Sequence, residues 1–115
     1  MKEIVIANLS LDFALRIVNL FKYLRNDKTE YVMSKQLLRC GTSIGANISE
    51  SEHAQSTADF ISKLYIALKE ANETKYWLTL LFRADYLNET EYESIMKDLR
   101  IILGTLVNTI KKTKE

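Results

Sequence analysis

The chain contains no proline, and its three glycines lie within stretches where apolar residues recur at helical spacing. Domains rich in β-strands use proline and glycine freely at their many turns. The pattern therefore predicts a few long helices joined by short polar loops. With 115 residues, the chain is long enough for one domain. Its 47% hydrophobic and 27% charged residues are typical of a folded protein rather than a disordered one.

Four segments place their apolar residues at about 100° per residue, the spacing of an amphipathic helix. They are predicted as helices over residues 11–25, 29–50, 57–84 and 90–112. Because the connections are short, neighbouring helices are expected to run antiparallel. The predicted fold is all-α, a single up-down-up-down four-helix bundle over residues 1–115. The predicted inward-facing residues are Ala14, Ile17, Val18, Phe21, Leu24, Met33, Leu37, Cys40, Ile44, Ile48, Phe60, Leu64, Ala67, Leu68, Ala71, Leu78, Phe82, Tyr92, Ile95, Met96, Leu99, Leu103, Leu106, Val107 and Ile110.

Capping residues mark the predicted starts of three helices. Ser10 is a plausible N-cap of the first helix. Ser56 with Asp59 resembles a capping box at the third, and Thr90 with Glu93 fits the same pattern at the fourth, which begins at residue 88 or 90. The sequence does not define the place of the apolar arm at residues 4–6.

Two motifs resemble the signature of a known family. They read Ser43-Ile44-Gly45-Ala46-Asn47-Ile48-Ser49-Glu50 and Lys69-Glu70-Ala71-Asn72-Glu73-Thr74-Lys75-Tyr76-Trp77-Leu78. The family is the four helix bundle protein family, also called the 23S rRNA intervening-sequence protein or S23 family. The resemblance runs from Phe13 to the last predicted helix. It implies a four-helix bundle that assembles into a ring-shaped homopentamer, as does a retroelement accessory protein of the same fold. Because family genes are often found within 23S rRNA intervening sequences, it also implies a link to RNA.

The third predicted helix is apolar around more of its circumference than one core requires. Such a helix is expected to be buried on several sides, which favours an oligomer over a monomer. Gly41 and Gly45 in the second helix each cost about 1 kcal/mol relative to alanine, which suggests close approach of another backbone there. The predicted oligomer contacts are Tyr65, Ile66, Tyr76 and Trp77.

Polar residues of the two motifs are expected to lie on facing sides of the second and third helices. If the hairpin is centred near Ala54, Arg39 lies level with Glu70 and the two can pair. One interpretation is a binding or assembly site. The other, which we favour, is a polar network that fixes the register between helices or subunits. The predicted members are Arg39, Ser43, Asn47, Glu50, Glu70 and Glu73.

Net charge is only +1, whereas a nucleic-acid-binding domain usually carries a clear basic excess. In a ring, however, one modest cluster per subunit becomes a repeated band that attracts phosphates. The alternative role of these lysines is helix-dipole compensation and solubility. The predicted phosphate contacts are Lys63, Lys69, Lys75, Lys111 and Lys112.

No catalytic residue, metal ligand or cofactor site is predicted. Glu50 and His53 have the Glu-x-x-His spacing of di-metal bundles, but such a site needs two motifs and this chain has one histidine. Cys40 lies on the inward stripe, where a free cysteine behaves as a small hydrophobe. Nothing brings an acid, a base and a nucleophile together, so an enzyme is the weakest of three functional hypotheses.

A single cysteine and the lack of a signal peptide predict a cytoplasmic protein. No apolar stretch is long enough for a membrane span, and no small-molecule substrate is predicted. The favoured hypothesis is a ring-forming, non-enzymatic accessory that associates with structured RNA or a ribonucleoprotein. The alternative is a protein–protein adaptor that does not itself bind nucleic acid.

Overall fold

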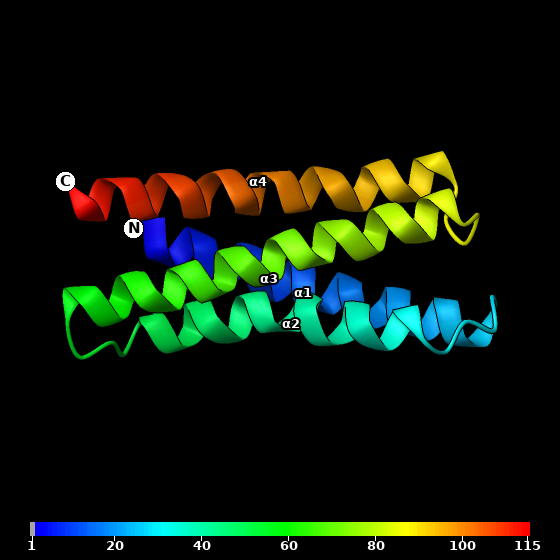
Figure 1. Ribbon diagram of the computed structural model, residues 1–115, viewed down its shortest axis with the longest axis horizontal. Coiled ribbons are helices and arrows are strands. Elements are labelled where there is room, and N and C mark those ends of the chain that lie inside the picture. Colours follow the sequence, from blue (N-terminus) through cyan, green and yellow to red (C-terminus); the bar gives the residue numbers. More distant parts are fainter. Residues whose placement is uncertain (1) are drawn as a thin grey trace.

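The computed structural model describes residues 2–115, with side chains from residue 6 onward. These residues form four helices. They are α1 (Lys2–Asn26), α2 (Met33–Ser51), α3 (Thr57–Arg83) and α4 (Glu89–Lys114). The helices run alternately in opposite directions, so both ends of the described chain lie at the same end of the bundle (Figure 1). No strand occurs among residues 2–115. The predicted all-α four-helix bundle is confirmed.

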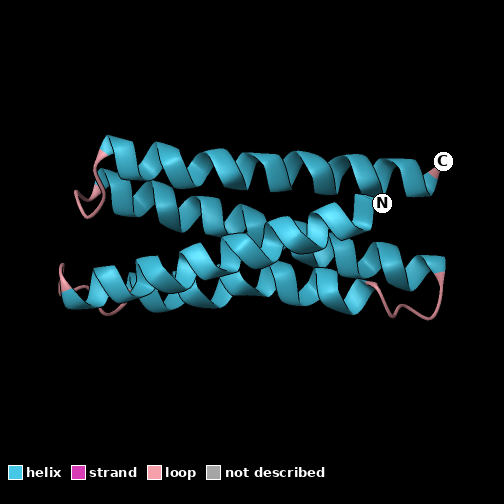
Figure 2. Cartoon of the chain, turned by 180° about the vertical axis from the view of Figure 1, so that it is seen from behind, coloured by secondary structure: helices cyan, strands magenta, loops and turns pink. Residues whose placement is uncertain are grey.

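Each helix packs against two others, in the pairs α1–α2, α2–α3, α3–α4 and α1–α4. The diagonal pairs α1–α3 and α2–α4 make no close backbone contact, so the cross-section is a square with four seams. Figure 2 shows the same arrangement from behind, with short loops at the two ends. The molecule measures 44 × 21 × 19 Å. At 1.5 Å per residue, the 26 residues of α4 span about 39 Å, nearly the whole long axis.

The core runs along the centre of the square and takes apolar side chains from all four helices. Its largest fully buried members are Phe13, Ile17, Leu24, Leu37, Ile44, Ile48, Leu64, Leu78, Leu81, Met96, Leu99 and Leu106. Most of these were predicted, but Phe13 and Leu81 were not. Val107 was predicted to face inward and is instead 49% exposed. It is flanked along α4 by Leu106 and Ile110, which are buried in its place.

The first helix begins at Lys2, nine residues before the predicted start at Leu11. Ser10 is therefore not an N-cap but a buried residue inside α1, whose Oγ donates to the carbonyl oxygen of Ala7 at 3.1 Å. That bond satisfies the hydroxyl within its own helix, so the serine does not end it. The predicted arm at residues 4–6 is the first part of α1, and Ile6 is buried in the core. The side chains of residues 4 and 5 lie outside the described set.

The second helix begins at Met33 rather than near Thr29, and Glu30 explains the difference. Thr29 takes a left-handed conformation with φ 50°. The Glu30 carboxylate accepts hydrogen bonds from the backbone N–H groups of Val32, Met33 and Ser34 at 3.0, 2.9 and 2.7 Å. Although burial alone would raise the pKa of Glu30, these bonds lower it below the usual value. Glu30 thus neutralises the first N–H groups of α2 as an N-cap would.

The third helix begins as predicted after Ser56, whose Oγ accepts from the backbone N–H of Asp59 at 3.0 Å. The Asp59 carboxylate accepts from the N–H of Gln55 at 3.2 Å rather than from that of Ser56. The predicted capping box is therefore only half formed.

The fourth helix has a complete capping box, but two residues earlier than the predicted Thr90–Glu93 pair. The N–H of Glu91 donates to Asn88 Oδ1 at 2.8 Å, and the N–H of Asn88 donates to Glu91 Oε1 at 2.9 Å. Asn88 was one of the two predicted starting positions. No described helix is both long enough and apolar enough to cross a membrane.

Candidate functional site

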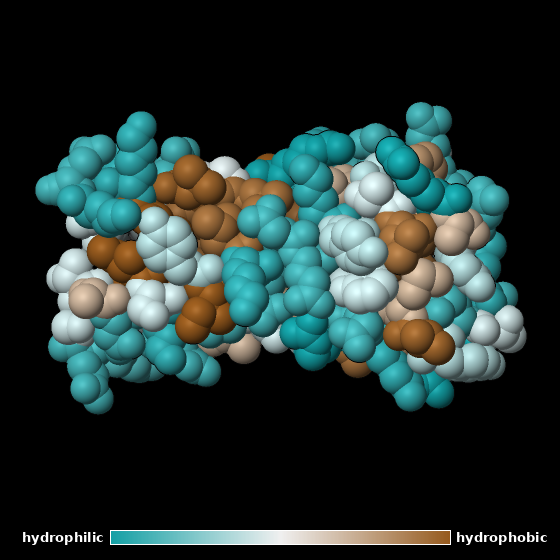
Figure 3. Space-filling model, in the orientation of Figure 1, coloured by the Kyte–Doolittle hydropathy of each residue, from teal (hydrophilic) through white to brown (hydrophobic). Residues whose placement is uncertain are grey.

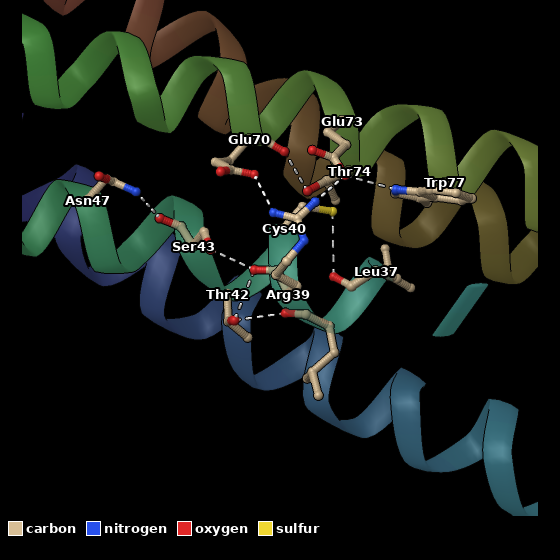
Figure 4. A network of polar contacts seen from close by, with 11 residues as sticks. Leu37, Arg39, Cys40, Thr42, Ser43, Asn47, Glu70, Glu73, Thr74 and Trp77 are labelled. Atoms are coloured by element: carbon tan, nitrogen blue, oxygen red, sulfur yellow. Dashed lines mark hydrogen bonds and ion pairs between the residues drawn. The ribbon is translucent and has the colours of Figure 1, made fainter. Parts of the chain in front are cut away.

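A cluster of polar side chains joins the middle of α2 to the middle of α3, and we call Arg39, Glu70, Glu73 and Trp77 the Arg39 cluster (Figure 4). Arg39 Nη1 donates to Glu70 Oε1 at 3.3 Å, and Nη2 donates to Glu73 Oε2. Trp77 Nε1 donates to the same Glu73 oxygen at 3.1 Å. The hydrogen bonds from Arg39 and then from Trp77 hold the pKa of Glu73 below its usual value. The guanidinium of Arg39 is thus shared between two carboxylates of the facing helix.

Helical spacing explains why these residues meet. Glu70, Glu73 and Trp77 are three and four residues apart, so they lie on one side of α3, opposite Arg39 of α2. The side chains of Arg39, Glu70 and Glu73 are 48%, 16% and 33% exposed. Pairs this exposed contribute little to stability, because water screens the attraction between the charges. The cluster therefore adds little to the stability of the bundle, and its role in fixing the register of α2 against α3 stays a prediction.

The other predicted members of the network do not join the cluster. Ser43 Oγ donates to the carbonyl oxygen of Arg39 at 2.7 Å, and Asn47 Nδ2 donates to that of Ser43 at 2.9 Å. Both side chains thus bond to their own helix. Glu50 instead pairs with Lys63 of α3 at 3.1 Å. The sequence placed all six residues between the right two helices, but it did not show which would bond within α2.

Cys40 lies beneath the cluster and is fully buried. Its Sγ donates to the carbonyl oxygen of Leu37 at 3.7 Å, and burial raises the pKa of the thiol. Thr74, also fully buried, donates to the carbonyl oxygen of Glu70 at 2.7 Å. A thiol held protonated in this way is a poor nucleophile. Among the described residues, no group of three or more His, Cys, Asp or Glu side chains could hold a metal ion.

A second polar contact, which the sequence did not suggest, joins α1 to α4. Arg16 Nη1 lies 2.7 Å from Asp98 Oδ2 and 3.1 Å from the carbonyl oxygen of Ser94, while Nη2 donates to Ser94 Oγ at 3.0 Å. The contact borders a surface cavity of about 460 Å³ between the two helices. Arg16 and Asp98 are 82 residues apart in the chain, so no local pattern relates them.

Comparison with known proteins identifies the family. The family model described as 23S rRNA-intervening sequence protein matches residues 2–108. The chain belongs to this family. It is 60% identical to a solved structure from Bacteroides thetaiotaomicron VPI-5482, described as a protein with unknown function from the S23 ribosomal protein family. The similarity covers 96% of this chain and 99% of the other, with a TM-score of 0.95. No curated protein matches the chain.

These findings confirm the family resemblance seen in the two sequence motifs. Neither description names an enzymatic activity. The family is described through its link to 23S rRNA. A partner as large as an RNA would contact the surface of the bundle.

The intervening-sequence protein exposes large apolar side chains on α1, α3 and α4, and of these helices α1 and α3 lie diagonally opposite. On α3, Ile66 is 39% and Tyr76 is 59% exposed. Tyr76 packs edge-on against Trp77, with 5.1 Å between ring centres. On α1, Leu11 and Leu15 are 69% and 62% exposed, and neither was predicted. On the face seen in Figure 3, apolar atoms gather in two patches separated by a hydrophilic band.

Four of the five predicted phosphate contacts lie on exposed parts of α3 and α4, and these are Lys69, Lys75, Lys111 and Lys112. Lys63 is instead the partner of Glu50. Lys111 and Lys112 belong, with Lys114, to the last turn of α4. Lys114 Nζ lies 3.3 Å from the Tyr65 hydroxyl, a contact that the sequence did not suggest because α3 and α4 carry these residues 49 positions apart. The roles of these lysines and of the oligomer contacts stay predictions.

Proposed function

We propose that this family member is a non-enzymatic homo-oligomer that associates with structured RNA or with a ribonucleoprotein. The observation that carries the RNA part is membership of a family described as 23S rRNA-intervening sequence proteins. We further propose a cytoplasmic location, where its RNA partner and a reduced Cys40 are both expected.

Two exposed apolar faces support the oligomer. Leu11 and Leu15 project from α1, whereas Ile66 and Tyr76 project from α3, which makes no close backbone contact with α1. Two different faces favour heterologous contacts, in which one face of a copy meets the other face of the next. Such contacts close into rings when the rotation between copies permits. The family resemblance implies five copies.

The side chains of Arg39 and Cys40 are already engaged or buried, which supports a non-enzymatic role. Arg39 is held by two carboxylates, and the Cys40 thiol is buried with a raised pKa. Among the exposed charged side chains are lysines on α3 and at the end of α4. Although each chain carries a net charge of only +1, a ring would repeat these lysines around its circumference.

Solution mass and RNA binding test the two parts separately. Light scattering coupled to size exclusion should give five times the chain mass of 13.3 kDa. The double change Leu11→Ser and Leu15→Ser should reduce that mass, whereas Val32→Ser, at an equally exposed position in the α1–α2 loop, should not. A monomeric mass for the unaltered chain would remove the oligomer.

Binding to a structured RNA should be tight at low salt and weaken steeply as salt rises. Absence of binding at low salt, or binding that ignores salt, would remove the RNA part of the proposal.

A protein–protein adaptor is the second candidate. It is favoured by the near-neutral charge together with exposed Tyr31, Tyr65 and Tyr76, since tyrosine is enriched at protein interfaces. A single stoichiometric protein partner that resists nuclease treatment would support this role over RNA association.

A further inference from the structure

A groove between α3 and α4, near the end of the bundle where α4 finishes, has a composition unlike the other cavities. Its volume is about 330 Å³. We call it the Tyr65 groove, and it is lined by Tyr65, Leu68, Val107, Ile110, Lys111 and Lys114. These are three aliphatic side chains, one aromatic ring and two ammonium groups, with no carboxylate. By contrast, Glu91 lines the α1–α4 cavity and Glu52 lines the α1–α2 cavity.

The aromatic ring in the groove is positioned by a lysine and remains accessible. Lys114 Nζ lies 3.3 Å from the Tyr65 hydroxyl and 5.6 Å from the centre of its ring. Tyr65 is 45% exposed, and Val107 beside it is 49% exposed. The groove therefore offers a partly open ring over an aliphatic floor, with a cation at its edge.

The charge around the groove is positive. The last turn of α4 carries Lys111, Lys112 and Lys114. Against these stand Glu115 and the C-terminal end of the helix dipole, which amounts to roughly half a negative charge. Three positive charges thus exceed about one and a half negative ones, and an anionic ligand is favoured.

We propose that the Tyr65 groove binds an unpaired segment of RNA, with a base stacked on Tyr65 and the neighbouring phosphates contacted by Lys111 and Lys114. The proposal rests on the RNA association proposed above, and it names the surface and the kind of RNA. Aromatic rings beside cations are the recurring device for holding single strands, because every base has a face that can stack.

The size of the groove selects an unpaired segment over a duplex. Ligand cavities range over about 300–1,000 Å³, so this one lies at the lower limit and suits a single planar group. In an A-form duplex the bases are stacked on one another and their faces cannot reach a side chain. Although an acidic segment of another protein would also meet the lysines, it would make no use of the exposed ring over the aliphatic floor.

The test uses the full chain and a short fluorescein-labelled oligouridylate, whose bases are not paired, alongside a labelled RNA hairpin. Tyr65→Ala should weaken oligouridylate binding by about tenfold, the loss of one stacked base. The double change Lys111→Gln and Lys114→Gln should make the binding constant less sensitive to salt. The slope of log K against log salt concentration should fall in magnitude by about 0.7 for each phosphate that a lysine no longer neutralises. The matched controls are Tyr31→Ala, a half-exposed tyrosine beside Arg25 at the other end of the bundle, and Lys35→Gln; neither should change binding.

Each other outcome overturns the proposal in a distinct way. If the hairpin binds but oligouridylate does not, or if Tyr65→Ala leaves oligouridylate binding unchanged, the groove is not the site while RNA association stands. If neither RNA binds at low salt, both proposals fail. If Tyr65→Ala instead alters the mass measured by light scattering and leaves RNA binding intact, the groove is an interface between copies of the chain.

Discussion

The three glycines allow a test of packing. The same substitution, Gly→Ala, is expected to stabilise the protein at one position and to destabilise it at another. Gly41 and Gly45 lie in α2 and Gly104 lies in α4. A Cβ added at Gly41 would lie 2.8 Å and 2.9 Å from the Cγ1 and Cγ2 atoms of Ile17. At Gly45 it would lie 3.4 Å from the backbone oxygen of Ser10, and at Gly104 nothing lies within 4 Å.

The expected free energies follow from these distances. Alanine gains about 0.5–1 kcal/mol over glycine in a helix interior. Gly104→Ala should show this gain in full. At Gly41 the Cβ overlaps Ile17, which is fully buried and, being β-branched, is restricted at χ1; overpacking of this kind costs about 1–3 kcal/mol. The net expectation for Gly41→Ala is a loss of about 1 kcal/mol, whereas Gly45→Ala should be close to neutral.

Guanidinium denaturation followed by far-UV circular dichroism, at one protein concentration, measures all three free energies of unfolding. An Ile17→Ala background supplies the decisive control, because it removes the three Ile17 side-chain atoms that the new Cβ would meet. In that background Gly41→Ala should stabilise rather than destabilise the protein. Equal stabilisation by Gly41→Ala and Gly104→Ala in the unaltered chain would refute the argument from close packing at Ile17.

Three further predictions concern the ionisable groups. Glu30→Gln should destabilise the protein by about 1–2 kcal/mol at neutral pH, because it removes a charged cap from α2. Since the pKa of Glu30 is lowered in the folded state, this difference in stability is present above the pKa of the unfolded chain and should vanish as the pH falls through the folded-state pKa. Denaturation at several pH values measures it. Trp77 is the only tryptophan, so its fluorescence emission reports on the cluster and should shift in Arg39→Met. In the unaltered protein the emission should also shift as Glu73 is protonated, at a pH below the ordinary pKa range of a glutamate. A midpoint at the ordinary glutamate pKa would contradict the cluster. Cys40 should resist a thiol reagent at mildly alkaline pH until denaturant is added, and rapid labelling of the native protein would show that the thiol is not buried.

The sequence predicted what depends on periodicity. Apolar spacing located all four helices, and the hairpin geometry of α2 and α3 placed Arg39 opposite Glu70, where the two lie 3.3 Å apart. The predictions were wrong where a polar side chain could form hydrogen bonds in more than one way. Ser10 was interpreted as a cap because serine favours that position, but its hydroxyl bonds to Ala7 inside α1. Glu30 was overlooked because a glutamate three residues before a helix has no conventional capping pattern.

Contacts between α1 and α4 and between α3 and α4 could not be predicted residue by residue. Arg16 and Asp98 are ordinary charged residues on helix surfaces, and many such pairs are compatible with the same bundle. Lys114 meets Tyr65 only because the lengths of the two helices bring the last turn of α4 beside the third turn of α3. Those registers depend on the packing of the whole core, which periodicity does not specify.

The square arrangement of the helices has a consequence for how the protein folds. Three of its seams join helices that follow one another in the chain, so their formation requires the closure of short loops only. The α1–α4 seam joins residues as far apart as Arg16 and Asp98, and it contains a cavity of about 460 Å³. We expect this seam to form last during folding and to open first from the native state, before any of the three seams between consecutive helices.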